Sequence, residues 1–272
     1  MKIVLILLLG IFLTVVLPVN AQKRNPVLEN GLSFLGTPYV AYTLEESEEE
    51  TLVVNSNGVD CMTFVEYVLA MSLCPPQKKD IEGVEFRKYL RQIRYRDGKM
   101  EGYTSRLHYV SDWINDNIRK GLIEDVTTVY SSFMDTLSLS YMSTQAKSYK
   151  QLNRSPENVS KMLEYEKALS GQTIHWIPKK EIPAEGFSWI ENGDIITITT
   201  TVPGLDSSHI GIAVYVKEKL HLLHASSVKG KVVVEEIPLS KQLDRNKNMS
   251  GIRVLRMKKT GIPSSPPPDS LK

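Results

Sequence analysis

Gly58-Val59-Asp60-Cys61-Met62-Thr63-Phe64 is the stretch around which the fold can be predicted. Asp60 is a residue type that caps helix N-termini, and apolar residues continue at helical spacing over 64–69 until Pro75. We therefore expect a helix that begins at Cys61. Free N–H groups and the helix dipole at such an end favour a thiolate, which makes Cys61 a candidate nucleophile. A small buried core cysteine is the alternative.

The regions on either side of this helix differ in pattern. Helical periodicity recurs at 84–95, 105–120 and 156–170, within a segment of about 80–180. Alternating β-rich runs follow at 194–201, 209–216, 219–224, 231–237 and 252–257. A helical half followed by an antiparallel sheet of about five strands indicates an α+β fold, with the Cys61 helix packed on the sheet.

Ser208-His209-Ile210-Gly211-Ile212-Ala213-Val214 supplies a possible base. Alternation places His209, Gly211 and Ala213 on one strand face. Small residues there would let a helix approach, so we expect the Cys61 helix on that face with its thiol within reach of His209. A structural histidine is the alternative.

The next strand contains His221 and His224, which alternation places on opposite faces. A base needs a partner on its second ring nitrogen, and neighbouring antiparallel strands can supply one. We expect His224 to orient His209 and His221 to be a surface or structural residue.

The overall composition excludes some partners. There are 33 basic and 31 acidic residues without a polybasic block, so nucleic acid and anionic membranes are not expected partners. Residues 45–50 form an acidic run that predicts a solvated surface loop. With only two cysteines, Cys61 and Cys74, a disulfide between them is a minor alternative.

The two ends of the chain suggest export. Residues 1–21 contain a lysine, an apolar run and a small-residue ending, typical of a cleaved signal peptide. The run is shorter than the roughly 20 residues of a membrane span, so no stable insertion is expected after cleavage. We expect one catalytic domain over 22–262 and a disordered Pro-rich tail over 263–272.

Five motifs occur in a recognisable order. They are Gly-Thr-Pro-Tyr (36–39), Asp-Cys (60–61), Asn-Gly-Asp-Ile-Ile (192–196), Ser-His-Ile-Gly-Ile (208–212) and His-Ala (224–225). In this order they resemble the NlpC-type family of papain-like cell-wall cysteine peptidases. The resemblance implies that Cys61 attacks, His209 is the base and His224 orients it. It also implies that Tyr39 and Asp60 support the active site and its oxyanion.

The chain departs from the usual family pattern in two places. Val40-Ala41-Tyr42 replaces the usual Trp-Gly-Gly, and a long helical insertion separates Cys61 from the strands. Within it, residues 94–98 and 102–109 resemble a small branch of N-acetylmuramoyl-L-alanine amidases. That resemblance predicts substrate contacts from Tyr103, Arg106 and His108. Helix-start residues with solvent-facing charges are the alternative.

These observations predict a cysteine amidase of peptidoglycan fragments that cuts between the muramic acid lactyl group and L-Ala. No metal or organic cofactor is expected. The alternative within the fold is a γ-D-glutamyl-diamino acid endopeptidase. A zinc hydrolase with Cys61, His209 and His224 as ligands, or an inert wall-binding module, are the rival classes.

Overall fold

The computed structural model describes residues 25–258. The predicted signal peptide (1–21) and the predicted disordered tail (263–272) lie outside the described residues. Within them the chain is α+β, as expected.

One antiparallel sheet forms the centre of the molecule. Its strands run in the order β1-β9-β5-β6-β7-β8, and β4 also pairs with β9. Neighbours along β5 to β8 are consecutive in the chain, whereas β9 returns across the sheet to pair with β5. The strands are β1 (Ile123–Asp125), β4 (Ile177–Pro178), β5 (Ile195–Thr200), β6 (Ser207–Val216), β7 (Lys219–Ser226), β8 (Lys231–Val234) and β9 (Met249–Met257).

The sheet therefore exceeds the expected five strands by β1 and β4, both of which come from the insertion. With three and two residues, these strands are too short to show an alternating pattern. They pair with β9 because its second edge would otherwise leave backbone groups unbonded.

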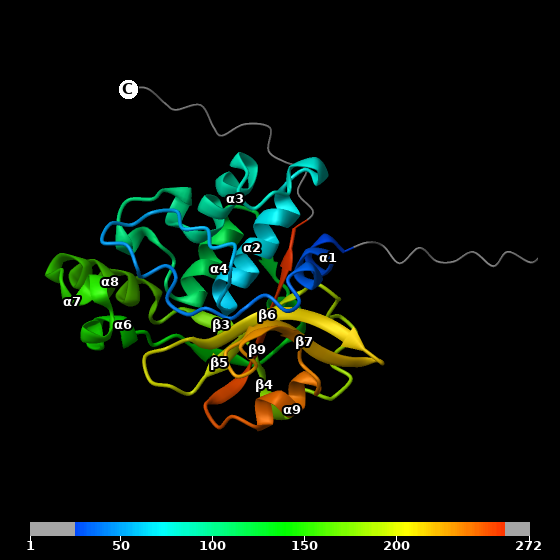
Figure 1. Cartoon of the computed structure of the whole chain (residues 1–272). Helices are drawn as coiled ribbons and strands as arrows, with labels where there is room; N and C mark the ends of the chain where they lie inside the picture. Colours follow the sequence, from blue (N-terminus) through cyan, green and yellow to red (C-terminus); the bar gives the residue numbers. More distant parts are fainter. Residues whose placement is uncertain (1–24, 259–272) are drawn as a thin grey trace, which may run out of the picture.

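Helices cover both faces of the sheet (Figure 1). On one face are α1 (Pro26–Ser33), α2 (Cys61–Leu73), α3 (Val84–Arg94) and α4 (Val110–Arg119), and on the other is α9 (Leu239–Asp244). Each face has its own apolar core. The predicted helices at 84–95, 105–120 and 156–170 are confirmed with shifted ends, whereas α1 was not anticipated.

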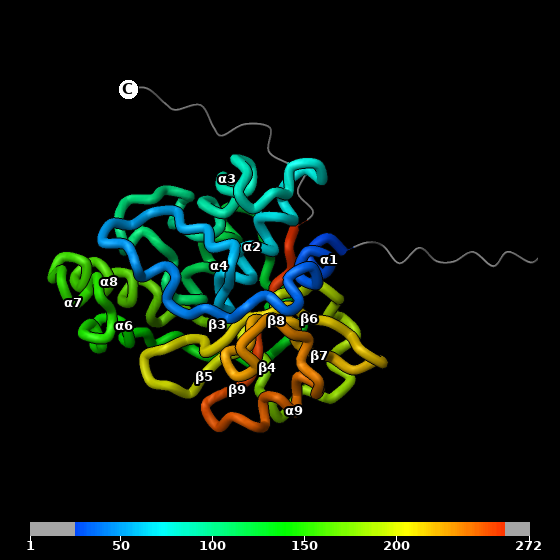
Figure 2. The backbone as a smooth tube through the Cα atoms, in the orientation of Figure 1, coloured from blue at the N-terminus to red at the C-terminus, as the bar shows by residue number. Residues whose placement is uncertain are grey.

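The middle of the insertion projects to one side of the sheet, as the backbone trace in Figure 2 shows. It holds α6 (Tyr141–Thr144), α7 (Lys150–Asn153) and α8 (Pro156–Leu169), with α5 (Thr127–Tyr130) and the hairpin of β2 (Met134–Thr136) and β3 (Thr173–His175). A third, smaller core of buried apolar residues holds this part together, including Tyr103, Met142 and Met162.

Candidate active site

The helix α2 begins at Cys61 because Asp60 caps it. Asp60 Oδ1 accepts hydrogen bonds from the backbone N–H and the hydroxyl of Thr63, each at 2.8 Å. The Thr63 hydroxyl oxygen in turn accepts from the Asp60 N–H at 2.8 Å. This reciprocal capping box fixes the chain direction at the start of the helix. The predicted helix start and its cap are confirmed.

Tyr39 reaches this helix start because residues 36–39 lie between the edge strand β8 and Val59. Gly58 allows the approach, since a Cβ there would overlap the side chain of Val40. The pKa of Tyr39 rises to about 12, first through burial and then through Cys61 and Asp60. Its hydroxyl is therefore a protonated donor beside the thiol. Backbone hydrogen bonds hold this segment in place. Named with the N–H donor first and the carbonyl acceptor second, they are Gly36–Val232 (3.0 Å), Val232–Thr37 (2.8 Å), Tyr39–Gly230 (2.9 Å), Val40–Val59 (3.1 Å) and Val59–Pro38 (3.0 Å).

The expectation about which strand face receives α2 is wrong. Phe64, Val65 and Val68 of α2 share a core with the β-branched side chains of β6, whereas Ala213 belongs to the core beneath α9. Isoleucine and valine side chains offer far more apolar area for burial than glycine and alanine, so hydrophobic packing selects their face. The β6 side chains in contact with this core are Ile210, Ile212 and Val214.

The thiol of Cys61 meets β6 at the peptide bond between His209 and Ile210. The backbone N–H groups of Ile210, and of Cys61 and Met62 at the helix start, all act to lower the pKa of the thiol. The half-buried sulfur thus faces the backbone of the residue that follows His209.

His209 and His224 form a direct imidazole pair. His209 Nε2 lies 2.6 Å from His224 Nδ1, and the two rings are nearly perpendicular at 89°. The hairpin of β6 and β7 brings them together, because its last register pair is Ile212 with Leu223. One position further, His224 comes opposite Gly211, so His209 is its diagonal neighbour. The predicted pairing of His209 with His224 rather than His221 agrees with this geometry.

Burial favours the neutral forms of the Cys61 thiol and the His209 imidazole. The pKa of Cys61 rises to about 12 because burial and then the Asp60 carboxylate outweigh the three N–H groups. The pKa of His209 falls to about 3 through burial and the neighbouring His224. This differs from the expected ready deprotonation at a helix N-terminus. The free site holds a thiol and a neutral imidazole.

Glu235 is a site residue that the sequence analysis missed. Its Oε2 lies 3.5 Å from His224 Nε2, and the two side chains are only 13% and 5% exposed. Its carboxylate raises the pKa of His224 against the larger lowering by burial. Glu235 lies within the run predicted at 231–237, without a motif that marks it as a partner of His224. The sequence did offer one signal. Glu235 is 11 positions after His224, a spacing at which a hairpin can bring the two side chains together.

His221 has a structural role, as one of the expected alternatives. It is 6% exposed, and its Nδ1 donates to the Glu235 carbonyl at 2.7 Å.

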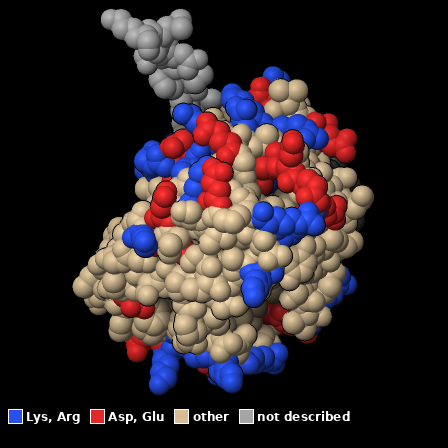
Figure 3. Space-filling model, turned by 90° about the vertical axis from the view of Figure 1, so that its left-hand side faces the viewer, with Lys and Arg blue, Asp and Glu red and all other residues tan. Residues whose placement is uncertain are grey.

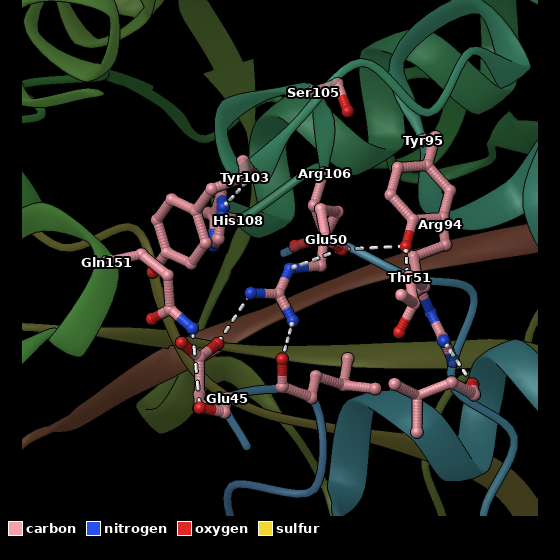
Figure 4. Close-up of polar contacts among 12 residues, drawn as sticks. Glu45, Glu50, Thr51, Arg94, Tyr95, Tyr103, Ser105, Arg106, His108 and Gln151 are labelled. Carbon is pink, nitrogen blue, oxygen red and sulfur yellow. Dashed lines mark hydrogen bonds and ion pairs between the residues drawn. The ribbon is translucent and has the colours of Figure 1, made fainter. Parts of the chain in front are cut away.

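The three predicted substrate-binding residues lie where the insertion meets the acidic loop (Figure 4). Arg106 is buried and ion-paired with Glu45 at 2.6 Å, and it also lies 3.6 Å from Glu50. His108 Nε2 is 2.9 Å from the Tyr103 carbonyl, and burial lowers its pKa to about 3. The alternative of solvent-facing charges does not fit Arg106.

The acidic run at 45–50 is a surface loop, as expected, with Glu48 and Glu49 exposed, but it is also tied to the insertion. Tyr95 donates to Glu50 at 2.7 Å, while Lys150 and Arg154 pair with Glu48 at 2.9 and 2.6 Å. The insertion thus fastens the loop through partners far away in the sequence. Separations of 45 to 106 residues hide these pairs from local pattern reading.

A surface hollow of about 470 Å³ lies between this loop and the insertion. Tyr103 lines it, and the buried Tyr103 hydroxyl has no hydrogen-bond partner among the described residues. Figure 3 shows the face of the molecule on which the insertion lies, with acidic and basic side chains interleaved across its upper part. The other lining residues are Glu48, Glu49, Glu50, Gly102, Lys150, Gln151, Arg154, Ser155 and Asn158.

A disulfide between Cys61 and Cys74 is incompatible with this fold. The two residues are the first residue and the C-cap of α2. Thirteen helical steps separate them by roughly 20 Å, whereas a disulfide needs Cα atoms within about 7 Å. Both thiols are free.

Two features are absent from residues 25–258. No helix there has the length and apolar character to cross a bilayer. In the same part of the chain no group of three or more Cys, His, Asp or Glu is arranged to hold a metal ion.

Solved structures with the same fold come from several bacteria. An N-acetylmuramoyl-L-alanine amidase from Bacteroides uniformis is 53% identical, with a TM-score of 0.83 over 86% of this chain and 98% of its own. A Bacteroides fragilis protein, named provisionally as a xylanase, is 58% identical, with a TM-score of 0.81 over 84% of this chain and 100% of its own. A Legionella pneumophila protein at 23% identity and a TM-score of 0.65 over 85% and 88% shares the fold.

No curated protein matches the chain. The sequence profile of the AmiA-like family, described as N-acetylmuramoyl-L-alanine amidase-like, matches residues 29–252. This match spans most of the chain and contains every predicted site residue. The chain therefore belongs to the AmiA-like family.

Proposed function

We propose that the protein is a cysteine-dependent N-acetylmuramoyl-L-alanine amidase, which hydrolyses the amide between the lactyl group of muramic acid and L-Ala. The observations that carry the proposal are Cys61 at a capped helix start, its thiol against the backbone of Ile210, and the His209–His224 contact that begins at the residue before Ile210. Family membership and the Bacteroides uniformis amidase support the same chemistry.

Acylation begins with both groups neutral. His209 Nε2 is engaged with His224, so Nδ1 is the nitrogen left to accept the thiol proton. The sulfur attacks the lactyl carbonyl and a C–S bond forms. As the C–N bond breaks, His209 returns the proton to the amine of L-Ala, and the peptide departs.

Stabilisation of the oxyanion falls to donors at the helix start. The Cys61 N–H points out of the first turn of α2, and the protonated Tyr39 hydroxyl lies beside it. Water then hydrolyses the thioester, with His209 as base, and releases muramic acid. These steps need no metal or organic cofactor.

The wider assignment follows from the sequence motifs. The protein is an NlpC-type, papain-like enzyme that acts on muropeptides or peptidoglycan after export and signal cleavage, in the periplasm or cell envelope. Tyr103, which lines the hollow, is the strongest candidate for a substrate contact. Arg106 and His108 act indirectly, by holding the side of the hollow that Tyr103 lines in place. Nucleic acid is not a partner, and the mature protein does not insert into a membrane.

The endopeptidase alternative loses its main support at Asp60. An endopeptidase would need a carboxylate near the nucleophile, such as Asp60, to bind the free amine of the stem peptide. Asp60 Oδ1 already accepts two hydrogen bonds from Thr63, which is its role as a cap. The amidase is therefore favoured.

Other classes fit the residues less well. Two nitrogens on one tetrahedral zinc lie about 3.3 Å apart, given Zn–N bonds of ~2.0 Å, whereas the imidazole nitrogens here are at a hydrogen-bonding 2.6 Å. A xylanase needs two carboxyl groups across the sugar, whereas a thiol and two imidazoles meet here. An inert wall-binding module would have no use for this intact set.

The test compares a muramyl tripeptide with the free tripeptide of the same sequence, with products identified by mass spectrometry. Release of the intact tripeptide from the sugar supports the amidase. Cleavage of the free tripeptide after D-glutamate supports the endopeptidase instead.

A further inference from the structure

His209, His224 and Glu235 form a line across three adjacent strands. His209 is on β6, His224 is on β7, and Glu235 follows the last residue of β8. Val233 is the register partner of His224, so Glu235 is its diagonal neighbour on the same sheet face. The geometry that brings His209 to one side of His224 thus brings Glu235 to the other.

The backbone of Glu235 is fixed independently of its carboxylate. Its N–H donates to the Leu222 carbonyl at 2.8 Å, and its own carbonyl accepts from His221 at 2.7 Å. The side chain is 13% exposed and reaches inward toward His224, 3.5 Å from Nε2. The next residue, Glu236, points outward, with a side chain that is 81% exposed.

His224 Nε2 depends on this carboxylate. The nitrogen is buried and has no hydrogen-bond partner within residues 25–258. The nearby carboxylate is an acceptor only, so a proton on Nε2 is the arrangement that it stabilises. A neutral imidazole carries a proton on only one of its two nitrogens, so Nδ1 of His224 is then unprotonated and can accept a hydrogen bond.

We propose that Glu235 is a positioning residue that selects the tautomers of both histidines. With a bare Nδ1, His224 accepts the Nε2–H of His209 across the 2.6 Å contact. His209 in turn keeps a bare Nδ1, which is the nitrogen that the Cys61 thiol needs as its base. The opposite tautomer of His224 would present a proton to His209 Nε2 and leave the proton of His209 on Nδ1, where it blocks the base.

The catalytic consequence rests on the proposed thiol chemistry, and the tautomer assignment does not. When His209 takes the thiol proton, positive charge develops on the imidazole pair, and Glu235 is the carboxylate on the far side of that pair. The titratable groups that act on the pair are the two histidines themselves and Glu235, while the charged group that acts on the Cys61 thiol is Asp60. Removing Glu235 therefore lowers the pKa of the pair and destabilises the charged intermediate.

The activity test uses Glu235→Ala, Glu235→Gln and Glu235→Asp, with Glu236→Gln as the matched control. Glu235→Ala should lower kcat by on the order of 10- to 100-fold, since it weakens a base that contributes about 10²- to 10⁴-fold. KM should stay near the parent value, and the acid limb of the kcat/KM profile should move to lower pH. Glu235→Asp should recover part of the loss, and Glu236→Gln should change neither quantity.

The second readout needs no turnover. Long-range ¹H–¹⁵N spectra of protein labelled in histidine, recorded in a Cys61→Ala background, report which nitrogen of His224 carries the proton. The proposal predicts Nε2–H with Glu235 and a mixed population or Nδ1–H in the Ala variant. If Glu235→Ala does not fold, Glu235→Leu, which fills similar space without an acceptor oxygen, carries both measurements.

Unchanged tautomers in the Ala or Leu variant overturn the proposal, as does a parent-like kcat and pH profile. A shift in tautomer alongside a protein that leaves muropeptides uncut would leave the positioning role standing and reject the amidase instead.

Discussion

His209 Nε2 and His224 Nδ1 lie 2.6 Å apart, so Nδ1 is the ring nitrogen of His209 that this contact does not engage. This relationship orders the expected effects of three substitutions. His209→Ala should abolish turnover because it removes the base, and His224→Ala should reduce kcat less. His221→Ala should keep most of kcat, because His221 bonds a backbone carbonyl. Steady-state kinetics on a muramyl peptide check this order. An inactive His221 variant beside an active His224 variant would contradict it.

Alkylation of Cys61 should be slow at neutral pH and accelerate as the pH rises. Burial and Asp60 hold the pKa of the thiol up to about 12, so little thiolate forms near pH 7. Iodoacetamide inactivation rates from pH 7 to 10 measure this, in a Cys74→Ala variant that removes the other thiol. A pH-independent fast reaction would contradict the neutral resting state.

Removal of metal should leave activity unchanged. The proposed steps use only the thiol and the imidazoles, so dialysis against a strong chelator should not lower kcat. Metal analysis of the purified protein accompanies the assay. Stoichiometric zinc, with activity restored only when zinc is added back, would assign the site to the zinc hydrolase class.

The buried Arg106 should stabilise the junction of loop and insertion. Arg106→Met leaves the carboxylates of Glu45 and Glu50 without their buried cation, which costs about 3–5 kcal/mol in the free energy of unfolding. Arg154→Met removes an exposed pair with Glu48 and should cost at most about 1 kcal/mol. Urea denaturation measures both. Equal losses would refute a special role for Arg106.

Acid should destabilise the fold through buried histidines. Burial lowers the pKa values of His108 and His209 to about 3, below the ~6.5 of an unfolded chain. The unfolded state therefore binds more protons as the pH falls below 6.5, and stability decreases toward pH 3 by at most about 1.4 kcal/mol per pH unit for each histidine. Denaturation curves at pH 7.5, 5.5 and 4.5 test this. His108→Gln should show the smaller decrease.

Much of the site was visible in local patterns. Asp60 before Cys61 predicted the capped helix, and the strand runs around His209 and His224 placed two histidines on neighbouring strands. Those signals are local because capping and alternation depend on a few consecutive residues.

What was missed depends on distant partners or on short elements. β1 and β4 contain too few residues to show a period. The choice of strand face for α2 depended on apolar area summed across the whole core rather than on the small residues near His209. Glu235 lies within the predicted run at 231–237, but its direction toward His224 follows from the register of β8 on β7. The acidic loop takes its partners from the insertion, 45 to 106 residues away in the sequence.

The most direct test of Cys61 as the nucleophile is to trap its acyl intermediate. The enzyme is mixed with a muramyl tripeptide, quenched in acid within milliseconds to seconds, and digested for mass spectrometry. The account predicts an N-acetylmuramoyl group as a thioester on the peptide that contains Cys61, absent from Cys61→Ala, which should not turn over. An adduct on another residue, or turnover by Cys61→Ala at a rate near that of the parent, would contradict it.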